Sequence, residues 1–382
     1  MTDLYFNNAF SKRPLTEVVQ RMIPFLEEEF ENPLTESESA EKVRVEMALA
    51  RQSIATLVGA QPEEIYFVSS GTEANNWALK GAAYAHQKTR NHLIVSGIEH
   101  FSVYQTAQFL QRQGFEITFI PVSNEGFVDV EVIAKSIRPT TILVSIQAAS
   151  DEIGVIQNLA AIASLKTRFG DVLFHTDAIQ YLCYEEISMS RLPFDLMSIS
   201  SNALYGPPGI GALYRRSDTR ISPILHGGMQ EGGMRPGLQS VALIAGFGEA
   251  ARVLTERRKA WKERLAGLQE KCFDAFDSLD VPVTGSKGCR IVDNLHVVID
   301  VDGEAFLTLL LTEGIRASSG STCYPYAQKE SHVLKALGIG KEAARGSILF
   351  TLSKDHDSKS IDVLLSSCRR NIEHLRRIKP LS

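Results

Sequence analysis

The sequence predicts an α/β protein, with a mostly parallel seven-stranded sheet in a large domain and a smaller α+β domain beside it. Three observations favour this class: the chain has 382 residues, hydrophobic residues make up 44% of it, and apolar runs alternate with amphipathic stretches from about residue 50 to 215. Strand–helix alternation over such a length is typical of a sheet that helices cover on both faces.

Seven short apolar runs are the candidate strands. They lie at residues 64–68, 92–96, 116–121, 141–146, 172–176, 196–200 and 211–214. Helical patterns separate them at residues 75–86, 103–113 and 158–169. Right-handed crossovers between parallel strands bring the carboxyl ends of the strands to one edge, where open α/β sheets bind ligands. We therefore expect a binding site along this edge.

The sequence changes in character from about residue 250. A long charged helix is predicted over residues 251–279, then an alternating strand at 294–300, a helix at 304–313, a Gly/Ser-rich loop at 318–321 and a final helix rich in Lys and Arg. We expect residues 15–250 to form the large domain, and residues 1–14 and 251–382 to form the small domain, which carries the loop of Cys323. The first dozen residues are expected to fold back near the site.

Composition excludes several classes of function. The net charge is −5 and no basic stripe is present, which disfavours nucleic-acid binding. No apolar run approaches the roughly 18 residues that span a bilayer, and the N-terminus lacks a signal-peptide core, so we expect a cytoplasmic protein. The 5 cysteines are odd in number and widely spaced, which argues against a disulfide framework and a zinc ribbon.

Polar segments follow the candidate strands at their carboxyl ends. Ser70-Gly71-Thr72 opens a helix, where free N–H groups favour a phosphate, although such a turn alone is as often only a cap. His100 could stack on a flat ring or move a proton, although a lone His is more often bonded to a loop. Asp177 could pair with a protonated ring nitrogen, and Gln180 could reach a ring hydroxyl or a phosphate.

Together with residues 198–214, these segments resemble the fold-type-I pyridoxal-phosphate (PLP) enzymes of the branch called class V aminotransferases. Within that branch they resemble the cysteine desulfurases of the NifS and IscS type, which implies the fold-type-I PLP-dependent transferase architecture. The family patterns read S-G-x-T-E-x-N-N, T-E-H, H-x-D-A-x-Q and S-x-H-K-x-x-G-P-x-G-x-G-x-L-Y. The resemblance covers nearly the whole chain. It includes the S-S-G-S-T-C run that ends at Cys323, which separates desulfurases from other class V enzymes.

The resemblance implies a homodimer that uses PLP to convert L-cysteine into L-alanine and leaves a persulfide on Cys323. The sulfur would pass to an Fe–S scaffold or another sulfur-acceptor protein. Cys323 and His100 are the implied catalytic residues, and His100 would also stack on the cofactor ring. The implied cofactor-binding residues are Thr72, Asp151, Asp177, Gln180, Ser200 and Asn202. No metal site is expected, although the thiolate of Cys323 could ligate an Fe–S cluster.

The chain departs from the family at positions that matter for this chemistry. Ala203 stands where a lysine should hold PLP as a Schiff base and move the Cα proton. Asn202 replaces a His that contacts the phosphate, and Asp151 replaces an Asn that bonds the ring hydroxyl. Leu349 replaces the Arg that clamps the substrate carboxylate. A positioned general base contributes about 10² to 10⁴ in rate, so we expect the family activity to be strongly impaired or lost.

Three functions therefore stay open. The chain could still be a desulfurase that holds PLP without a covalent bond, with His100 moving the proton. It could instead be a non-catalytic homologue, a pseudoenzyme that carries sulfur on Cys323 or docks onto an Fe–S scaffold. A transaminase-like or lyase reaction ranks last because it leaves Cys323 unexplained. Lys12 could enter the site as a substitute amine, although the surface is the ordinary place for a lysine.

Overall fold

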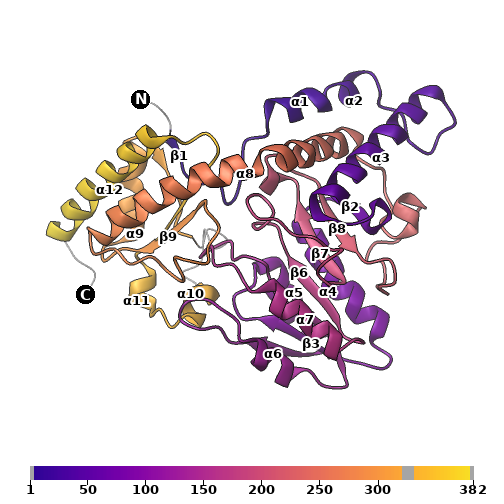
Figure 1. The fold of residues 1–382 in the computed structure, drawn as a ribbon, viewed down its shortest axis with the longest axis horizontal. Helices are drawn as coiled ribbons and strands as arrows, with labels where there is room; N and C mark the ends of the chain where they lie inside the picture. The colour runs from indigo at the N-terminus through magenta and orange to yellow at the C-terminus, as the bar shows by residue number, and fades with distance from the viewer. Residues whose placement is uncertain (1–3, 321–330, 379–382) are drawn as a thin grey trace.

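A seven-stranded sheet forms the centre of the larger part of the molecule in the computed structural model, which describes residues 4–320 and 331–378 (Figure 1). The strand order is β2-β8-β7-β6-β5-β3-β4. The strands are β2 (Ile65–Val68), β3 (His92–Ser96), β4 (Glu116–Ile120), β5 (Thr141–Ser145), β6 (Leu173–Asp177), β7 (Leu196–Ser200) and β8 (Gly211–Arg215). β8 is antiparallel to both of its neighbours, and the strands from β7 to β4 are parallel. The predicted class and all seven predicted strands are confirmed.

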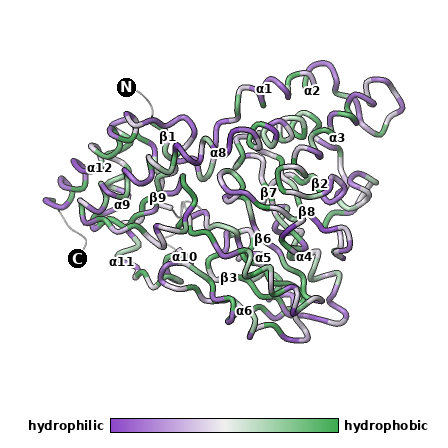
Figure 2. The backbone as a smooth tube through the Cα atoms, in the orientation of Figure 1, coloured by the Kyte–Doolittle hydropathy of each residue, from purple (hydrophilic) through white to green (hydrophobic). Residues whose placement is uncertain are grey.

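Both faces of this sheet are buried. In β3, Leu93 and Val95 pack with α4 (Gly71–His86) and α5 (Phe101–Arg112), whereas Ile94 packs into the core on the opposite face. The helices α6 (Val130–Ser136), α7 (Leu159–Arg168) and α3 (Glu38–Val58) contribute to that second core. Two-sided burial explains why most of these strands are rich in apolar residues, which appear as hydrophobic segments in the larger part of the molecule in Figure 2.

A long helix, α8 (Val241–Asp277), runs from the sheet to the smaller part of the molecule (Figure 1). It begins at Val241 rather than at residue 251 as predicted. Two glycines in its first part pack closely: a Cβ at Gly248 would lie 2.4 Å from the Cα of Ala50, and a Cβ at Gly246 would lie 2.7 Å from Met22 Cγ. The proposed domain boundary at residue 250 falls inside this helix and stays a prediction.

The smaller part is built on a pair of antiparallel strands, β9 (Asn294–Val298) and β11 (Ser347–Thr351). Its helices are α9 (Gly303–Thr312), α10 (His332–Ala336), α11 (Lys341–Ala344) and α12 (Ser358–Ile378). The N-terminal strand β1 (Leu4–Tyr5) pairs in parallel with β10 (Ile315–Arg316), and α1 (Thr16–Met22) and α2 (Pro24–Glu27) follow on the side of the larger part. The N-terminal segment therefore crosses from one part to the other.

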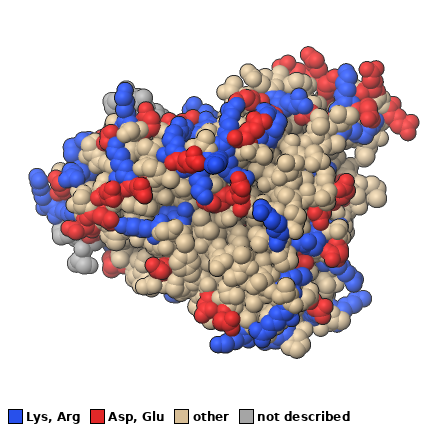
Figure 3. Space-filling model, viewed as in Figure 1, with Lys and Arg blue, Asp and Glu red and all other residues tan. Residues whose placement is uncertain are grey.

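Charges of both signs are mixed over the face of the molecule that Figure 3 shows. None of the helices in the described ranges is long and apolar enough to cross a membrane.

Candidate active site

A cavity of about 230 Å³ lies at the carboxyl ends of the sheet strands. It brings together six of the residues predicted from the sequence: Thr72, His100, Asp151, Asp177, Gln180 and Ser200. Ala9 and Phe10 also line it, so the N-terminal segment returns to the site as predicted. Among the described residues that line the cavity there is no lysine or arginine.

One end of the cavity is the start of α4. Ser70 caps this helix, and its hydroxyl accepts a hydrogen bond from the Glu73 N–H at 3.2 Å. The N–H groups of the first turn have no partner within the helix, which makes this end suitable for a phosphate. Gly71 allows a close approach here, because a Cβ would lie 2.2 Å from Ile179 Cδ1 and 3.3 Å from Ser200 Cβ, so the Ile179 side chain would have to move. The turn can therefore lie directly against two other cavity residues.

A chain of hydrogen bonds connects Asn75 of α4 to Asp177 and His100. The amide nitrogen of Asn75 donates to Asp177 Oδ2 at 2.6 Å and to Ser102 Oγ at 2.7 Å. Ser102 Oγ lies 2.7 Å from His100 Nδ1, which also accepts from the Ser102 N–H. In the neutral ring of His100, Nδ1 is thus the acceptor and Nε2 carries the proton. Sequence reasoning missed Ser102, and it quoted Asn75 in a motif without giving it this role.

The carboxylates around the cavity affect one another. Burial raises the pKa of Asp177. The nearby His100 and the hydrogen bonds from the Ile179 N–H and the Asn75 amide lower it, but by less. Burial also raises the pKa of Glu99 well above its ordinary value, and the charges of Asp177 and Asp151 raise it further. Glu99 is fully buried, and its Oε1 accepts a hydrogen bond from the Gln147 N–H. The cavity residues Asp151 and Asp177 therefore lie close to another acidic side chain, that of Glu99.

Two polar residues hold the N-terminal segment against the site. Gln180 donates to the carbonyl of Ala9, and Asn202 donates to the carbonyl of Phe10, both at 3.2 Å. Asn202 does not line the cavity. Its side chain supports the wall of the cavity, and its assignment as a cofactor contact stays a prediction.

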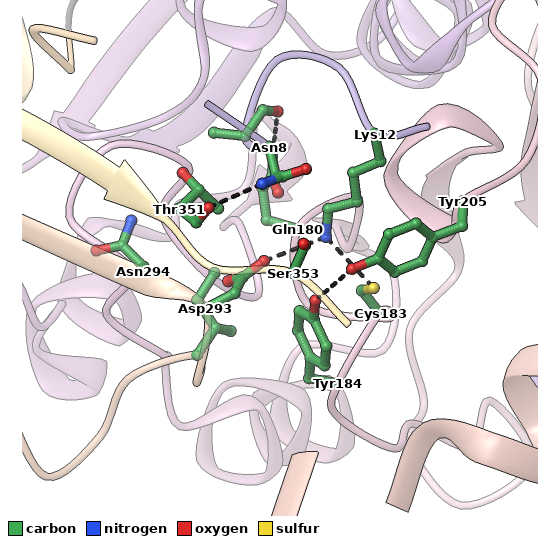
Figure 4. A network of polar contacts seen from close by, with 12 residues as sticks. Asn8, Lys12, Gln180, Cys183, Tyr184, Tyr205, Asp293, Asn294, Thr351 and Ser353 are labelled. Atoms are coloured by element: carbon green, nitrogen blue, oxygen red, sulfur yellow. Dashed lines mark hydrogen bonds and ion pairs between the residues drawn. The ribbon is translucent and has the colours of Figure 1, made fainter. Parts of the chain in front are cut away.

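The expectation that Lys12 lies on the surface is wrong. Its side chain is buried, and Nζ lies 3.1 Å from Asp293 Oδ2 and 3.3 Å from Cys183 Sγ (Figure 4). The ammonium also lies over the rings of Tyr184 and Tyr205, at 4.8 and 5.1 Å. Burial alone would lower the pKa of Lys12, but Cys183 and Asp293 raise it above its ordinary value. Lys12 is thus a charged anchor outside the cavity lining.

The smaller part of the molecule is fixed to the site through Ser331 and His332. Ser331 Oγ lies 2.7 and 2.9 Å from the two carboxyl oxygens of Glu152, and His332 Nε2 lies 2.8 Å from the carbonyl oxygen of Glu99. Cys323 lies outside the described residues. Leu349 is buried within β11, where its N–H donates to the Ser318 carbonyl at 2.8 Å.

We expect Glu152→Gln to remove part of the pH dependence of folding stability. Burial raises the pKa of Glu152 to about 8 from an ordinary 4.5. The native state therefore keeps a proton that the unfolded chain releases, and stability falls as the pH rises between these values. This loss should amount to a few kcal/mol at most and be absent in the variant. Urea denaturation at about pH 5 and pH 8 measures it.

The exposed Glu63→Gln is the matched control, and it should retain the native pH dependence. If the Glu152 variant lost as much stability between the two pH values as the native protein, the buried carboxyl would not be the cause.

Comparison with known proteins agrees with this geometry. The sequence profile of the aminotransferase class V family matches residues 4–356. The chain therefore belongs to the aminotransferase class V family, and within it the chain is a homologue of the cysteine desulfurases. The cysteine desulfurase IscS of Dictyoglomus turgidum is 38% identical, over 99% of this chain and 96% of that protein.

Solved structures extend the likeness. A NifS-like protein has a TM-score of 0.92 and 30% identity, covering 98% of this chain and 100% of its own. SspA, solved in complex with cysteine, has a TM-score of 0.82 and 32% identity over 91% of this chain and 98% of its own. The predicted resemblance is confirmed, while the reading of Ala203 as the lysine position stays a prediction.

The residues present fit non-covalent binding of the PLP that the family implies. The turn at Gly71 and the hydroxyls of Thr72 and Ser200 suit a phosphate, and the Asn75-held carboxylate of Asp177 suits a pyridinium nitrogen. A covalent anchor is missing from the described lining of the cavity.

Proposed function

We propose that the chain is a desulfurase-like protein of sulfur mobilisation that binds L-cysteine and PLP without a covalent bond to the cofactor. The observation that carries this proposal is the single cavity in which residues suited to the phosphate and ring of PLP converge without a lysine among its described lining residues. In the proposed reaction the Cβ–S bond of cysteine breaks, a thiolate at Cys323 takes up the sulfur as a persulfide, and the remainder leaves as alanine.

The residues of the chain would have distinct tasks. Thr72, Ser200 and the start of α4 would hold the phosphate, and Asp177 would hold the protonated ring nitrogen. Bound PLP would supply the electron sink. His100 lines the cavity with its Nδ1 occupied by Ser102, so the proton that it can give to a ligand is the one on Nε2. His100 would therefore donate a proton from Nε2, and its ring would stack on the ring of the cofactor.

A partner is needed to receive the persulfide sulfur, and we propose an Fe–S scaffold or another sulfur-acceptor protein.

We further propose a homodimer. Leu225, Met229 and Leu238 lie on one loop of the larger part and are 44%, 74% and 71% exposed. Large apolar side chains gathered on a surface loop favour contact with a second protein surface, here a second copy of the chain.

A second candidate function is that of a non-catalytic homologue that carries sulfur on Cys323 or docks onto an Fe–S scaffold. The observation that favours it is the acidic cavity: Asp151 and Asp177 both line it, and no described lysine or arginine does.

Formation of alanine from L-cysteine separates the two candidates. With PLP and a reductant present, we expect more alanine with the protein than with PLP alone, because the cavity would orient the reactants. Cys323→Ala should abolish this excess, whereas Cys289→Ala, which removes an exposed free cysteine, should keep it. If the amount of alanine were no higher than in the protein-free control, the desulfurase proposal would fail and the carrier or docking function would remain.

A further inference from the structure

We propose that Asn75 is a positioning residue for two residues that line the cavity, Asp177 and His100. Its amide holds the carboxylate of Asp177 in the charged form, and through Ser102 it directs a hydrogen bond onto Nδ1 of His100. The tasks of Asp177 and His100 rest on the proposed function. The inference goes further, because it assigns the state of both residues to a third residue that does not itself line the cavity.

Asn75 stands at a position where the helix alone would not favour an asparagine. It is fully buried within α4, between the buried Ala74 and Ala78. Asparagine has a low helix propensity, and a buried polar group is unfavourable unless it is hydrogen-bonded. Its side-chain oxygen has no hydrogen-bond partner in the described part of the chain. The asparagine is therefore explained by the site and not by the helix.

Both amide protons of Asn75 are donated to the site. Nδ2 donates to Asp177 Oδ2 at 2.6 Å and to Ser102 Oγ at 2.7 Å. The amide does not fit the other way round, because its oxygen would then face a carboxylate oxygen, acceptor against acceptor. Asn75 is thus a donor to both of its partners.

The first of these bonds supports the charge of Asp177. Burial raises the pKa of Asp177, whereas the nearby His100 and the hydrogen bonds from the Ile179 N–H and the Asn75 amide lower it. A hydrogen bond to the charged form of an acid favours that form. Removing the Asn75 amide should therefore favour the protonated form of Asp177.

The other acids around Asp177 do not replace this donor. After burial, the charge of Asp151 contributes to raising the pKa of Asp177. After burial, the charge of Asp177 in turn contributes to raising the pKa of Glu99. Among the described residues that line the cavity there is no lysine or arginine to offset these charges. The carboxylate of Asp177 therefore depends on His100 and on neutral donors such as Asn75.

The second bond acts on His100 without contact between Asn75 and the ring. Because Ser102 Oγ accepts from Asn75, its own proton can point to His100 Nδ1, 2.7 Å away. Nδ1 also accepts from the Ser102 N–H at 3.1 Å, where His100 caps the start of α5. With two donors on Nδ1, the proton of the neutral ring lies on Nε2.

Asn75 also relates Asp177 to the start of α4. Gly71 and Thr72 in the first turn of this helix line the cavity, and Asn75 follows one turn later. Four residues of helix rise about 6 Å. One helix therefore sets the spacing between the turn that suits a phosphate and the residue that holds the carboxylate.

Carbon NMR of the full chain, isotopically labelled at its aspartate carboxyls, tests the first bond, with Asp177→Asn to identify the signal. Asn75→Leu keeps the branched shape and removes both donors. We expect it to lower the ionisation constant of Asp177 roughly tenfold or more, so that Asp177 keeps its proton to a higher pH. Asn371→Leu is the matched control, because Asn371 is 7% exposed and donates to Glu313 Oε1 at 3.0 Å in the smaller part. It should leave the titration of Asp177 unchanged.

Nitrogen NMR of labelled histidine tests the second bond. Asn75→Asp keeps nearly the same shape but replaces the donor by an acceptor, so the Ser102 hydroxyl should turn toward position 75 and away from His100. The Nδ1 signal of His100 should then move, although position 75 does not contact the ring. Asn371→Asp should leave this signal in place.

Both signals are measured without a bound ligand. An unchanged ionisation constant of Asp177 in Asn75→Leu would overturn the first role, and an unchanged Nδ1 signal in Asn75→Asp would overturn the second. If the variants did not fold, the native protein would decide. Its Asn75 side-chain N–H signals should shift with the same midpoint as the Asp177 carboxyl, and signals that stayed constant through that titration would overturn the inference.

Calorimetric titration with pyridoxine 5′-phosphate tests the proposed cofactor separately. This probe carries the phosphate and the ring nitrogen but no aldehyde, so it does not react with surface amines. We expect Asn75→Leu to weaken its binding roughly tenfold, whereas Asn371→Leu should not. If the probe did not bind the native protein, the proposed cofactor would fail, and the titrations of the free protein would still decide the role of Asn75.

Discussion

Replacing Ala203 with lysine should give a protein that holds PLP covalently and forms alanine from L-cysteine about 10² to 10⁴ times faster than the native chain, the range that a positioned general base contributes. The turn Asn202–Leu204 directly follows β7, whose last residue, Ser200, lines the cavity. The long stem of a lysine at position 203 could therefore bring its amine to the site. Borohydride trapping followed by peptide mass spectrometry would locate the cofactor, and an alanine assay would measure the rate.

Ala160→Lys is the matched control, because Ala160 is exposed on α7 and PLP also reacts with surface amines. The control should show neither trapping at the site nor a faster reaction. If the Ala203 variant behaved like the control, position 203 would not be the missing lysine position. If it trapped PLP without forming alanine, other departures such as Asp151 would be what blocks the reaction.

Replacing Lys12 with methionine should destabilise the protein by about 3–5 kcal/mol, because removing one partner of a buried ion pair leaves the other charge uncompensated. The side chains of Lys12 and Asp293 are 1% and 2% exposed. Asp293 Oδ1 has no hydrogen-bond partner in the described part of the chain, so Lys12 is the main compensation for this carboxylate. Urea denaturation of both proteins gives the difference.

Two further variants make this test specific. Lys42→Met breaks a surface pair with Glu29, in which the lysine side chain is 57% exposed, and should cost no more than about 1 kcal/mol. Adding Asp293→Asn to the Lys12 variant should restore part of the lost stability, since the buried charge is then gone. If Lys12→Met and Lys42→Met lowered the free energy of unfolding by the same amount, the buried ion pair would stabilise the fold no more than the exposed one.

The sheet could be predicted closely because its strands are buried on both faces. β3 was predicted at its observed bounds, since all its residues are buried and Leu93, Ile94 and Val95 form an unbroken apolar run. The start of α8 was missed for the opposite reason. Gly246 and Gly248 weaken a helical pattern, and their purpose, close packing against Met22 and Ala50, is a tertiary contact that one sequence does not reveal.

The residues that line the cavity were predictable from short local motifs, whereas contacts between residues far apart in the sequence were not. Thr72, Asp177 and Gln180 could be assigned from short motifs that follow strands, and they meet in one cavity. Lys12 could not, because its partner Asp293 is 281 residues away along the chain. Local patterns favoured a surface lysine, and only the fold supplies the buried carboxylate that reverses this expectation.

The path of the N-terminal segment sets the order in which the site is completed during synthesis. Ala9 and Phe10 form part of the cavity wall, and besides Gln180 and Asn202 the segment needs partners that are made late: Leu4 pairs with Ile315, and the amide of Asn8 donates to the carbonyl of Thr351, 343 residues further along. At roughly 5–20 residues per second, the ribosome needs on the order of 20–70 s to supply the partner. The contacts of Leu4 and Asn8 with the smaller part can therefore form only after residues 315 and 351 have been made.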